Sequence, residues 1–476
     1  MKEQRTNNRN IAVCITAFIV MFALIVGALA LKFFVLSESD GKGTMPIMTA
    51  FLLTCAVMLM LVMAYSVYVI SAREEFIKRP KKIIVIITTL TATYLLNVIL
   101  ATYSYYYLMI ALTALVLAPL SDKKDVFIAN MMSAIFTFVT LFMNANYAGT
   151  EFNCYVTITL MMILDIVIGS AVTVLLSGSY HRTAFVLVGA VIQSVALALI
   201  FGLSYAMIPT NVIDDVVLTV VCVYAPVLLS LVIQPLFESI FSILSNSKLY
   251  ELTDHSSPLI KRLIKEAPGT FNHCLSVASY AEVCAIAIGE NPHLAKACAY
   301  YHDIGKIENP KYFSENQGNS NLHDGLLPEV SADIIRKHTT DGLELCEKYR
   351  IPAEIREVTI QHHGTLPISV FYYKAKGLTD SDVDIYDYCY HGVTPEGKIA
   401  AILMICDATE AAIRAMGKPS AEEVDKLITG IINDRINNKQ FDNCSITLED
   451  LSVIKSTIID VYGGHVHKRV QYPSGR

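Results

Sequence analysis

Residues 47–70 read IMTAFLLTCAVMLMLVMAYSVYVI, an apolar run that contains no charged side chain. An α-helix needs about 20 such residues to cross the hydrocarbon core of a bilayer. Similar runs recur along the first half of the chain and stop near residue 240. They predict eight membrane-spanning helices, at 11–36, 47–70, 82–101, 104–120, 126–146, 155–177, 183–207 and 213–236.

The composition indicates that one half of the 476-residue chain lies in lipid and the other half in water. Hydrophobic residues make up 54% of the sequence and charged residues 17%, which is more apolar than soluble domains are. A formal net charge of -6 gives no broad basic surface and argues against DNA or RNA as a partner, while a compact nucleotide ligand stays compatible. The eleven cysteines form no C-x-x-C pair and are expected to be reduced core residues.

Basic residues in the loops predict the orientation, because they are retained on the cytoplasmic side of a membrane. They precede the first predicted span and follow the second, fourth and sixth, whereas the opposite loops are acidic, with Lys42 as the exception. We therefore expect both termini to be cytoplasmic. Ala28-Leu29-Ala30 resembles a signal-peptidase site, but the apolar run continues to Leu36 and favours a retained anchor.

Asp165 falls near the middle of the sixth predicted span. An ionised carboxylate costs a few kcal/mol at that depth, so the side chain is expected to face the interior of the helix bundle. Two interpretations stay open: a ligand or proton site, and a protonated or hydrogen-bonded packing residue.

The second half of the chain carries the caps of successive helices and no convincing alternating strand pattern. Asn291-Pro292 is typical of a helix start, and Ser420 with Glu423 forms a capping box. The predicted fold class is all-α. It comprises a tail at 1–10, a polytopic helical membrane domain at 11–240, a connector at 241–258 and an all-α cytoplasmic domain at 259–476.

Eleven of the twelve histidines lie after residue 250, and several stand at the ends of apolar helix patterns. With two aspartates they form the set His273, His302, Asp303, His338, His362, His363 and Asp407. Imidazoles and carboxylates are ligands for iron, manganese and zinc, and a pair of such ions suits phosphodiester hydrolysis. The pair His323-Asp324 lies in a polar loop with no apolar helix to bury it, and is expected to be structural.

The motif His302-Asp303-Ile304-Gly305-Lys306 resembles the signature of the HD superfamily of metal-dependent phosphohydrolases. Five further motifs are similar, in their order, to those of the bacterial seven-transmembrane HD (HDIG) family of the PgpH type. They are Glu266–Thr270 ahead of His273, Glu315-Asn316-Gln317, His338 with Asp341-Gly342, His362-His363-Gly364-Thr365, and Asp407 with Glu410-Ala411-Ala412. The resemblance covers the second half of the chain and the helices that precede it.

This resemblance implies hydrolysis of cyclic di-AMP to the linear dinucleotide pApA with two divalent metal ions, manganese or iron. It implies that the seven residues of the set ligate these ions and that Asp303 bridges them. Asp303 and Lys306 are then the residues expected to be catalytic, with Lys306 as a phosphate contact; a solvated lysine at a helix end is the alternative. The implied location is the inner (plasma) membrane of a bacterial cell, and homo-oligomer formation stays open.

Three features differ from the family pattern. Only about ten residues, 37–46, separate the first two spans, where members usually carry a large extracytoplasmic domain. Cys274 stands where serine is expected, and residues 388–395 are less rich in proline than the family loop. Sensory input from outside and the contacts at the substrate rim are therefore not implied by the resemblance.

Three rival functions are weighed against this interpretation. The HD-GYP branch cleaves cyclic di-GMP, but its Gly-Tyr-Pro signature is absent after Gly364. A one-metal HD hydrolase of mononucleotides leaves His338, His362 and His363 unexplained, and a non-catalytic or weakly catalytic nucleotide receptor usually has eroded ligands. The aromatic run Phe371-Tyr372-Tyr373 is compatible with adenine stacking, although core packing is the commoner role of such a cluster.

Overall fold

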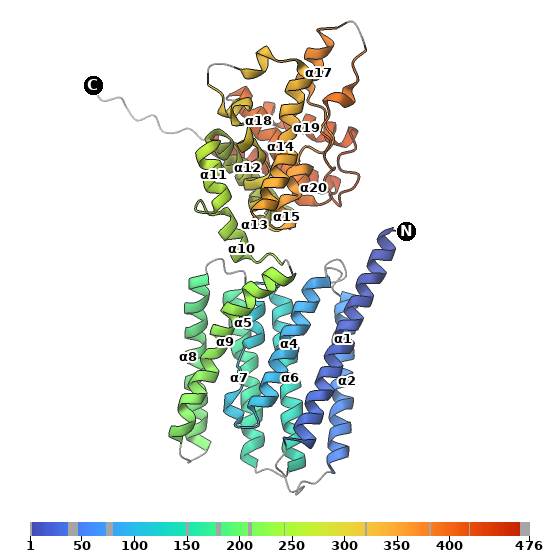
Figure 1. The fold of residues 1–476 in the computed structure, drawn as a ribbon. Helices are drawn as coiled ribbons and strands as arrows, with labels where there is room; N and C mark the ends of the chain where they lie inside the picture. Colours follow the sequence, from blue (N-terminus) through green and yellow to red (C-terminus); the bar gives the residue numbers. More distant parts are fainter. Residues whose placement is uncertain are drawn as a thin grey trace, which may run out of the picture. The chain divides into compact units, whose positions relative to one another are not determined.

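The computed structural model describes residues 2–36, 46–72, 80–148, 152–177, 182–207, 212–241, 243–318, 321–379, 382–417 and 419–466. The chain divides into two compact units, Met1–Ser247 and Lys248–Arg476. Within the described residues both units are helical, and the only strand-like pairing is an isolated bridge between Pro367 and Cys389 (Figure 1). The predicted all-α class is therefore confirmed.

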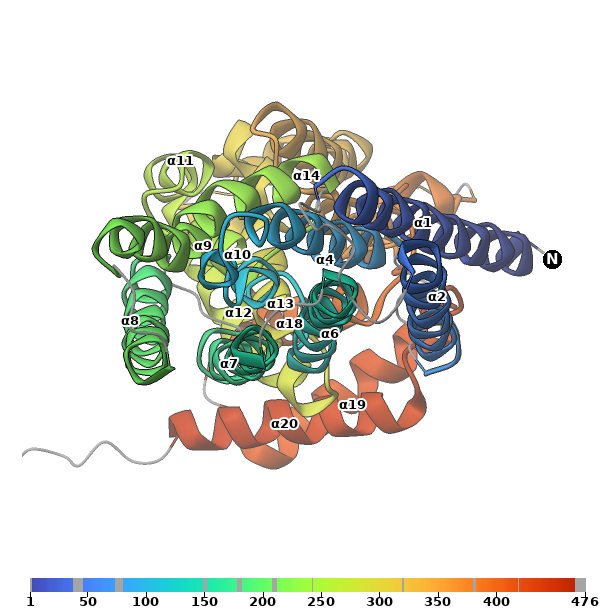
Figure 2. The same ribbon diagram turned by 90° about the horizontal axis from the view of Figure 1, so that it is seen from below.

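The first unit is built from long apolar helices. They are α1 (Lys2–Phe34), α2 (Ile47–Ala72), α4 (Pro80–Leu100), α6 (Lys123–Ala148), α7 (Phe152–Leu176), α8 (Arg182–Met207) and α9 (Val212–Phe241), with the short η1 (Tyr105–Tyr107) and α5 (Leu112–Leu117) between α4 and α6. Among the described residues, seven helices are long and apolar enough to cross a membrane. The chain is thus a multi-pass membrane protein, and Figures 1 and 2 show α1 beside α2 and α4.

The prediction of eight spans is wrong at 104–120, and the expected tail is not separate from the first helix. Helix α1 begins at Lys2, so residues 2–10 are helical. Residues 104–120 form η1, a non-helical stretch and the six-residue α5 in place of a continuous helix. Several loop residues on which the predicted orientation rests, including Glu38, Asp40 and Arg79, lie outside the described residues.

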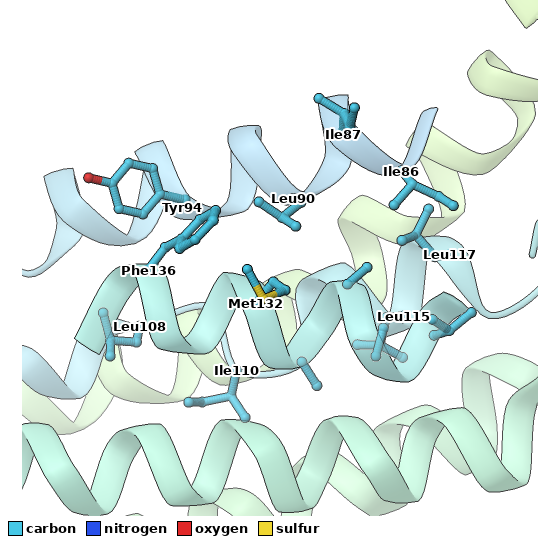
Figure 3. Close-up of a cluster of buried hydrophobic side chains, with 14 of the residues drawn as sticks. Ile86, Ile87, Leu90, Tyr94, Leu108, Ile110, Leu115, Leu117, Met132 and Phe136 are labelled. Atoms are coloured by element: carbon cyan, nitrogen blue, oxygen red, sulfur yellow. The ribbon is translucent and has the colours of Figure 1, made fainter. Parts of the chain in front are cut away.

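The interruption centres on Ala111, which has a φ of 59°. The apolar side chains around it are buried: Leu108, Ile110, Leu115 and Leu117 pack against α4 and α6 (Figure 3). Backbone that leaves the helix at this depth has no water to bond with, so other groups must satisfy its N–H and C=O. Hydropathy alone does not predict the break in the helix, because the segment is as apolar as a spanning helix.

Five buried polar side chains from five helices supply those hydrogen bonds; we call them the amide clamp, and they are Asn97, Asn130, Asp165, Gln193 and Gln234. Asp165 Oδ1 accepts from the N–H of Ala111 at 2.7 Å, and Gln193 Nε2 donates to the C=O of Ile110 at 2.8 Å. The same peptide unit is therefore held from both sides. Asn97 and Asn130 accept from Met109 N and Ala114 N, and Gln234 donates to Leu115 O.

Asp165 thus faces the interior of the bundle, as predicted, and its hydrogen bond favours the packing interpretation over a ligand site. Replacing Asp165 with leucine leaves the buried N–H of Ala111 without an acceptor, which costs about 1–3 kcal/mol. We expect Asp165→Leu to lower the thermal unfolding temperature of the full chain in detergent. Asp165→Asn keeps an acceptor oxygen and should lie closer to wild type.

The matched control for this measurement is Val167→Leu, on the exposed face of the same helix. Equal unfolding temperatures for Asp165→Leu and Val167→Leu would contradict a structural role for the carboxylate.

The second unit holds shorter helices joined by 3-10 turns. They are α10 (Asn246–Thr253), α11 (Pro258–Glu266), α12 (Pro268–Ala287), α13 (Pro292–Tyr301), η2 (Ile304–Glu308), η3 (Pro310–Tyr312), η4 (Ser314–Asn316), η5 (Leu322–Gly325), α14 (Pro328–Lys348), α15 (Ala353–Arg356), α16 (Val358–Gln361), α17 (Ser369–Lys376), η6 (Ile385–Tyr388), α18 (Lys398–Met416), α19 (Ala421–Asn437) and α20 (Leu448–Val466). Helix α12 packs against α13, α18 and α20 and forms the centre of the unit.

The predicted caps are present where they bear on the core. Asn291 accepts from two backbone N–H groups at the start of α13, and Ser420 and Glu423 form the capping box of α19. Helix α13 ends at Tyr301, and the chain continues into η2, which packs closely on α14. A Cβ on Gly305 would lie 2.0 Å from the C=O of His338, so only glycine permits this approach.

Candidate metal centre

The structure brings together all seven residues of the predicted ligand set. They come from α12 (His273), the end of α13 (His302 and Asp303), α14 (His338), the turn after α16 (His362 and His363) and α18 (Asp407). Six of the seven are buried, and His363 is half-buried. The ends of α13 and α16 and one face each of α12, α14 and α18 thus converge on one point of the second unit.

The ligand atoms divide into two groups that have one member in common. His273, His302, Asp303 and Asp407 form the first group, and Asp303, His338, His362 and His363 form the second. Within each group the potential ligand atoms lie within 4.8 Å of one another. Each group is therefore compact enough to surround a single cation.

Asp303 presents one carboxylate oxygen to each group. Its Oδ2 lies 3.3 Å from His302 Nε2 and 3.5 Å from His273 Nε2, both of the first group. Its Oδ1 lies 3.3 Å from His338 Nε2 and 3.6 Å from His362 Nε2, both of the second group. This orientation is the one that a bridging carboxylate requires.

The Nδ1 atoms of four histidines are bonded away from the centre. Those of His302, His338 and His362 donate to the C=O groups of Ala299, Ile335 and Val358 at 2.8, 2.5 and 3.1 Å. Nδ1 of His273 bonds to the Glu410 carboxylate. Such bonds fix the ring orientation and leave Nε2 as the ligand atom, which is the usual arrangement around metal-bound histidines.

The donor set fits a divalent cation. His302 Nε2 and Asp303 Oδ1 are buried and form no hydrogen bond with any described residue, a costly state that a bound cation relieves. Nitrogen and oxygen donors of this kind suit iron, manganese or zinc. Cys274 Sγ lies 3.9 Å from Nδ1 of His302, the nitrogen that faces away from the centre.

The charges around the centre favour the ionised form of Asp303, the neutral form of His338 and a positive charge at His273. Burial would raise the pKa of Asp303, but Lys306 and His302 hold it well below its usual range. Burial lowers the pKa of His338 to about 3, against the opposing charge of Asp303. Burial would also lower the pKa of His273, but bonds to Asp407 and Glu410 raise it to about 10. These carboxylates favour a positive charge at His273, which a metal ion would supply.

Lys306 is held between two carboxylates. Its Nζ lies 2.6 Å from Asp303 Oδ2 and 2.9 Å from Glu315 Oε1, and its side chain is 12% exposed. The predicted phosphate contact of Lys306 stays a prediction, since the structure places two acidic partners on the same ammonium group.

Glu315 joins Lys306 to the start of α12. Thr270 Oγ1 donates to Glu315 at 3.0 Å, and Asn316 accepts from the N–H groups of Gly269 and Thr270. A Cβ on Gly269 would lie 1.9 Å from the C=O of Glu315, so the close approach of η4 requires glycine there. Thr270 therefore fastens η4 and does not act as the helix cap that its position suggests, because α12 already begins at Pro268.

Replacing Glu315 with glutamine should release Lys306 while preserving the packing of η4. A neutral amide at position 315 removes one of the two carboxylates that contact Nζ. Lys306 then pairs with Asp303 alone and competes more strongly with a metal ion for that carboxylate. We expect a severalfold weaker metal affinity, measured by metal titration of the full chain. Metal affinity that equals wild type would contradict this coupling; Glu422→Gln, exposed on α19, is the control.

Three residues near the centre have no role that the sequence alone assigns. Glu410 stands three residues after Asp407 on α18, and that spacing, which puts both on one face, is the signal for its bond to His273. Tyr390 stacks on His363 with ring centroids 4.3 Å apart, and the ring of Phe313 meets that of His338 at 5.6 Å. No local pattern indicates these two ring contacts, which depend on tertiary packing.

His323 lies outside both ligand groups. Its side chain is buried against Tyr312 and Phe371, and Nε2 bonds to the C=O of Tyr312 at 3.0 Å. The expectation that no apolar residues bury it is wrong, whereas its structural role agrees with these contacts. Phe371 is itself core, and Tyr373 is exposed, so the two ends of the aromatic run lie in different environments.

Comparison with known proteins agrees with this geometry. Residues 270–412 match the family model for the HD domain, a range that contains all seven ligand candidates. The chain is 36% identical over 373 residues to the cyclic-di-AMP phosphodiesterase PgpH of Listeria monocytogenes serotype 1/2a (strain 10403S), covering 77% of this chain and 50% of that protein. It is 41% identical over 255 residues to the protein of the same name from Bacillus subtilis (strain 168), covering 53% and 36%.

The crystal structure of the L. monocytogenes PgpH HD domain in complex with cyclic-di-AMP is 44% identical, covers 45% of this chain and 100% of that chain, and gives a TM-score of 0.43. The chain spans about half the length of the Listeria relative. The 373-residue alignment is longer than the second unit and so extends into the apolar helices. Residues 270–412 therefore form an HD domain, and the chain is similar to PgpH over this domain and part of the apolar region; among the described residues, seven apolar helices precede the domain.

Proposed function

We propose that the chain is a membrane-bound, metal-dependent phosphodiesterase that hydrolyses cyclic di-AMP to pApA. The observation that carries the proposal is the position of Asp303, whose two oxygens face two separate ligand groups. The similarity to the PgpH phosphodiesterases supports the choice of substrate.

His273, His302 and Asp407 would hold one ion and His338, His362 and His363 the other, with Asp303 shared. Metal ions held by these residues would supply hydroxide as the nucleophile and positive charge toward the phosphoryl oxygens. The side chains themselves hold their positions through the backbone bonds at Nδ1, so little reorganisation accompanies binding. Lys306 would contribute a positive charge to the phosphate, beside Asp303.

Manganese or iron is the proposed metal: the nitrogen and carboxylate donors are compatible with both, and the family resemblance implies these two metals. The test is an assay of the purified full chain in detergent with each metal, supplied with cyclic di-AMP or cyclic di-GMP. We expect pApA as the product and faster turnover of cyclic di-AMP. Faster hydrolysis of cyclic di-GMP would place the chain with the rival enzymes, and tight binding without turnover would make it a nucleotide receptor.

We also propose that both termini and the second unit are cytoplasmic, which follows from the basic loops of the sequence. Reporters fused after residues 79 and 248 are then expected to be cytoplasmic, and a reporter at residue 214 external. A cytoplasmic signal at residue 214 would overturn this topology.

A further inference from the structure

An apolar groove of about 600 Å³ runs between α1 and α4 in the first unit. Eight residues of α1 between Arg9 and Leu24 line it, and six of α4 between Ile84 and Leu95. On each helix the lining residues recur every three or four positions, so each helix contributes one face. The groove is thus a property of the α1 and α4 pairing.

The walls of the groove are mostly apolar, and the polar groups along them are the hydroxyl groups of Thr16, Thr88 and Thr91. The hydroxyl groups of Thr16 and Thr91 donate to Ala12 O and Ile87 O of their own helices, at 2.8 and 2.7 Å. Arg9 is the one charged residue of the lining, and it forms no ion pair with any other described residue. A ligand that fits must therefore be apolar for most of its length and anionic at one end.

The length of the groove matches one leaflet. From Ile84 to Leu95 the α4 wall extends about 16 Å at 1.5 Å per residue, and half of a 30 Å hydrocarbon core is about 15 Å. Helices α1, α2 and α4 follow one another across the bundle, so α1 and α4 run in the same direction (Figure 1). Arg9 therefore lies at the end of the groove where α4 begins, and the exposed Lys81 stands in the first turn of α4.

We propose that this groove binds one acyl chain of an anionic phospholipid, with the lipid phosphate paired to the guanidinium of Arg9. A guanidinium binds phosphate oxygens in a bidentate manner, and the charge of Lys81 adds to the preference for an anionic headgroup. A helix from a second copy fits less well, because an apolar helix would leave Arg9 without a counter-charge.

The test is native mass spectrometry of the full chain, released from micelles that contain phosphatidylglycerol or phosphatidylcholine. Wild type should retain one phosphatidylglycerol in preference to phosphatidylcholine. Arg9→Gln should weaken that retention about fivefold, the effect of one basic group near a membrane surface. Ala92→Trp should remove it, because Ala92 lines the groove from its exposed side and an indole fills the space.

Lys124→Gln at the start of α6 and Ala198→Trp on the exposed face of α8 are the matched controls, and both should retain lipid as wild type does. Equal retention of the two lipids by wild type, or lipid binding unaffected by both Arg9→Gln and Ala92→Trp, would overturn the proposal. A dimer that Ala92→Trp dissociates, with lipid retention unchanged, would assign the groove to a second copy. Arg9→Gln leaves the helix packing intact and keeps the test decisive if Ala92→Trp does not fold.

Discussion

Replacing Asp303 with alanine is expected to remove nearly all bound metal and all measurable turnover. Both carboxylate oxygens face ligand groups, one each, so the substitution takes an anionic ligand from two cations at once. Two divalent ions a few ångströms apart then repel one another without a bridging charge. Elemental analysis of the purified full chain, together with the cyclic di-AMP assay, measures both effects.

His323→Ala is the control for this experiment. The imidazole of His323 is buried and belongs to neither ligand group, so its loss should leave the metal content at the wild-type value. Undiminished metal in Asp303→Ala, or a wild-type content of one ion per chain, would exclude a shared carboxylate between two ions.

A different result is expected for His362→Ala, which should keep one ion and lose most of the other. His362 belongs to the second group alone, where its Nε2 lies 3.3 Å from that of His338. The first group keeps all four of its ligands. Activity should fall by several orders of magnitude, because nucleophile and phosphate are no longer positioned by two ions.

The mirror variant His273→Ala makes this measurement specific, since His273 belongs to the first group alone. Each variant should retain about one ion per chain. The addition of excess metal should not restore the activity of either variant. If His362→Ala and His273→Ala both lose all metal, the two groups do not bind independently, and the separation seen in the geometry has no counterpart in solution.

The ligand set could be predicted from the sequence because several members interrupt an apolar helix pattern and because the order of the motifs resembles that of the HD family. His302 and Asp303 end an apolar helix, and Asp407 interrupts a buried helix face, where an unpaired carboxylate is costly. The bond from His273 to Glu410 could also have been predicted from the sequence, because Asp407 and Glu410 share a face of α18. The stacking of Tyr390 on His363 could not have been predicted in this way, since it joins segments that only the folded chain brings together.

The interrupted segment of the first unit was missed for a different reason. Hydropathy sums side chains, whereas the break at Ala111 depends on which backbone groups find partners. Those partners are single polar residues on separate helices, such as Asn97 and Gln234, and each alone is compatible with ordinary helix packing. Only their convergence on residues 109–115 indicates a non-helical stretch.

The amide clamp also constrains how the membrane unit is made. A ribosome delivers residues 101–121 before four of the five clamp side chains exist, and the last of these, Gln234, arrives with the final span, α9. Until then the backbone around Ala111 lacks part of its hydrogen-bond partners, and each unsatisfied group in the hydrocarbon costs several kcal/mol. The nascent segment must therefore wait outside the hydrocarbon core or cross it as a plain helix, and take its broken form only after synthesis of the bundle is complete. A chain that ends before α9 lacks the contact from Gln234 to Leu115 O.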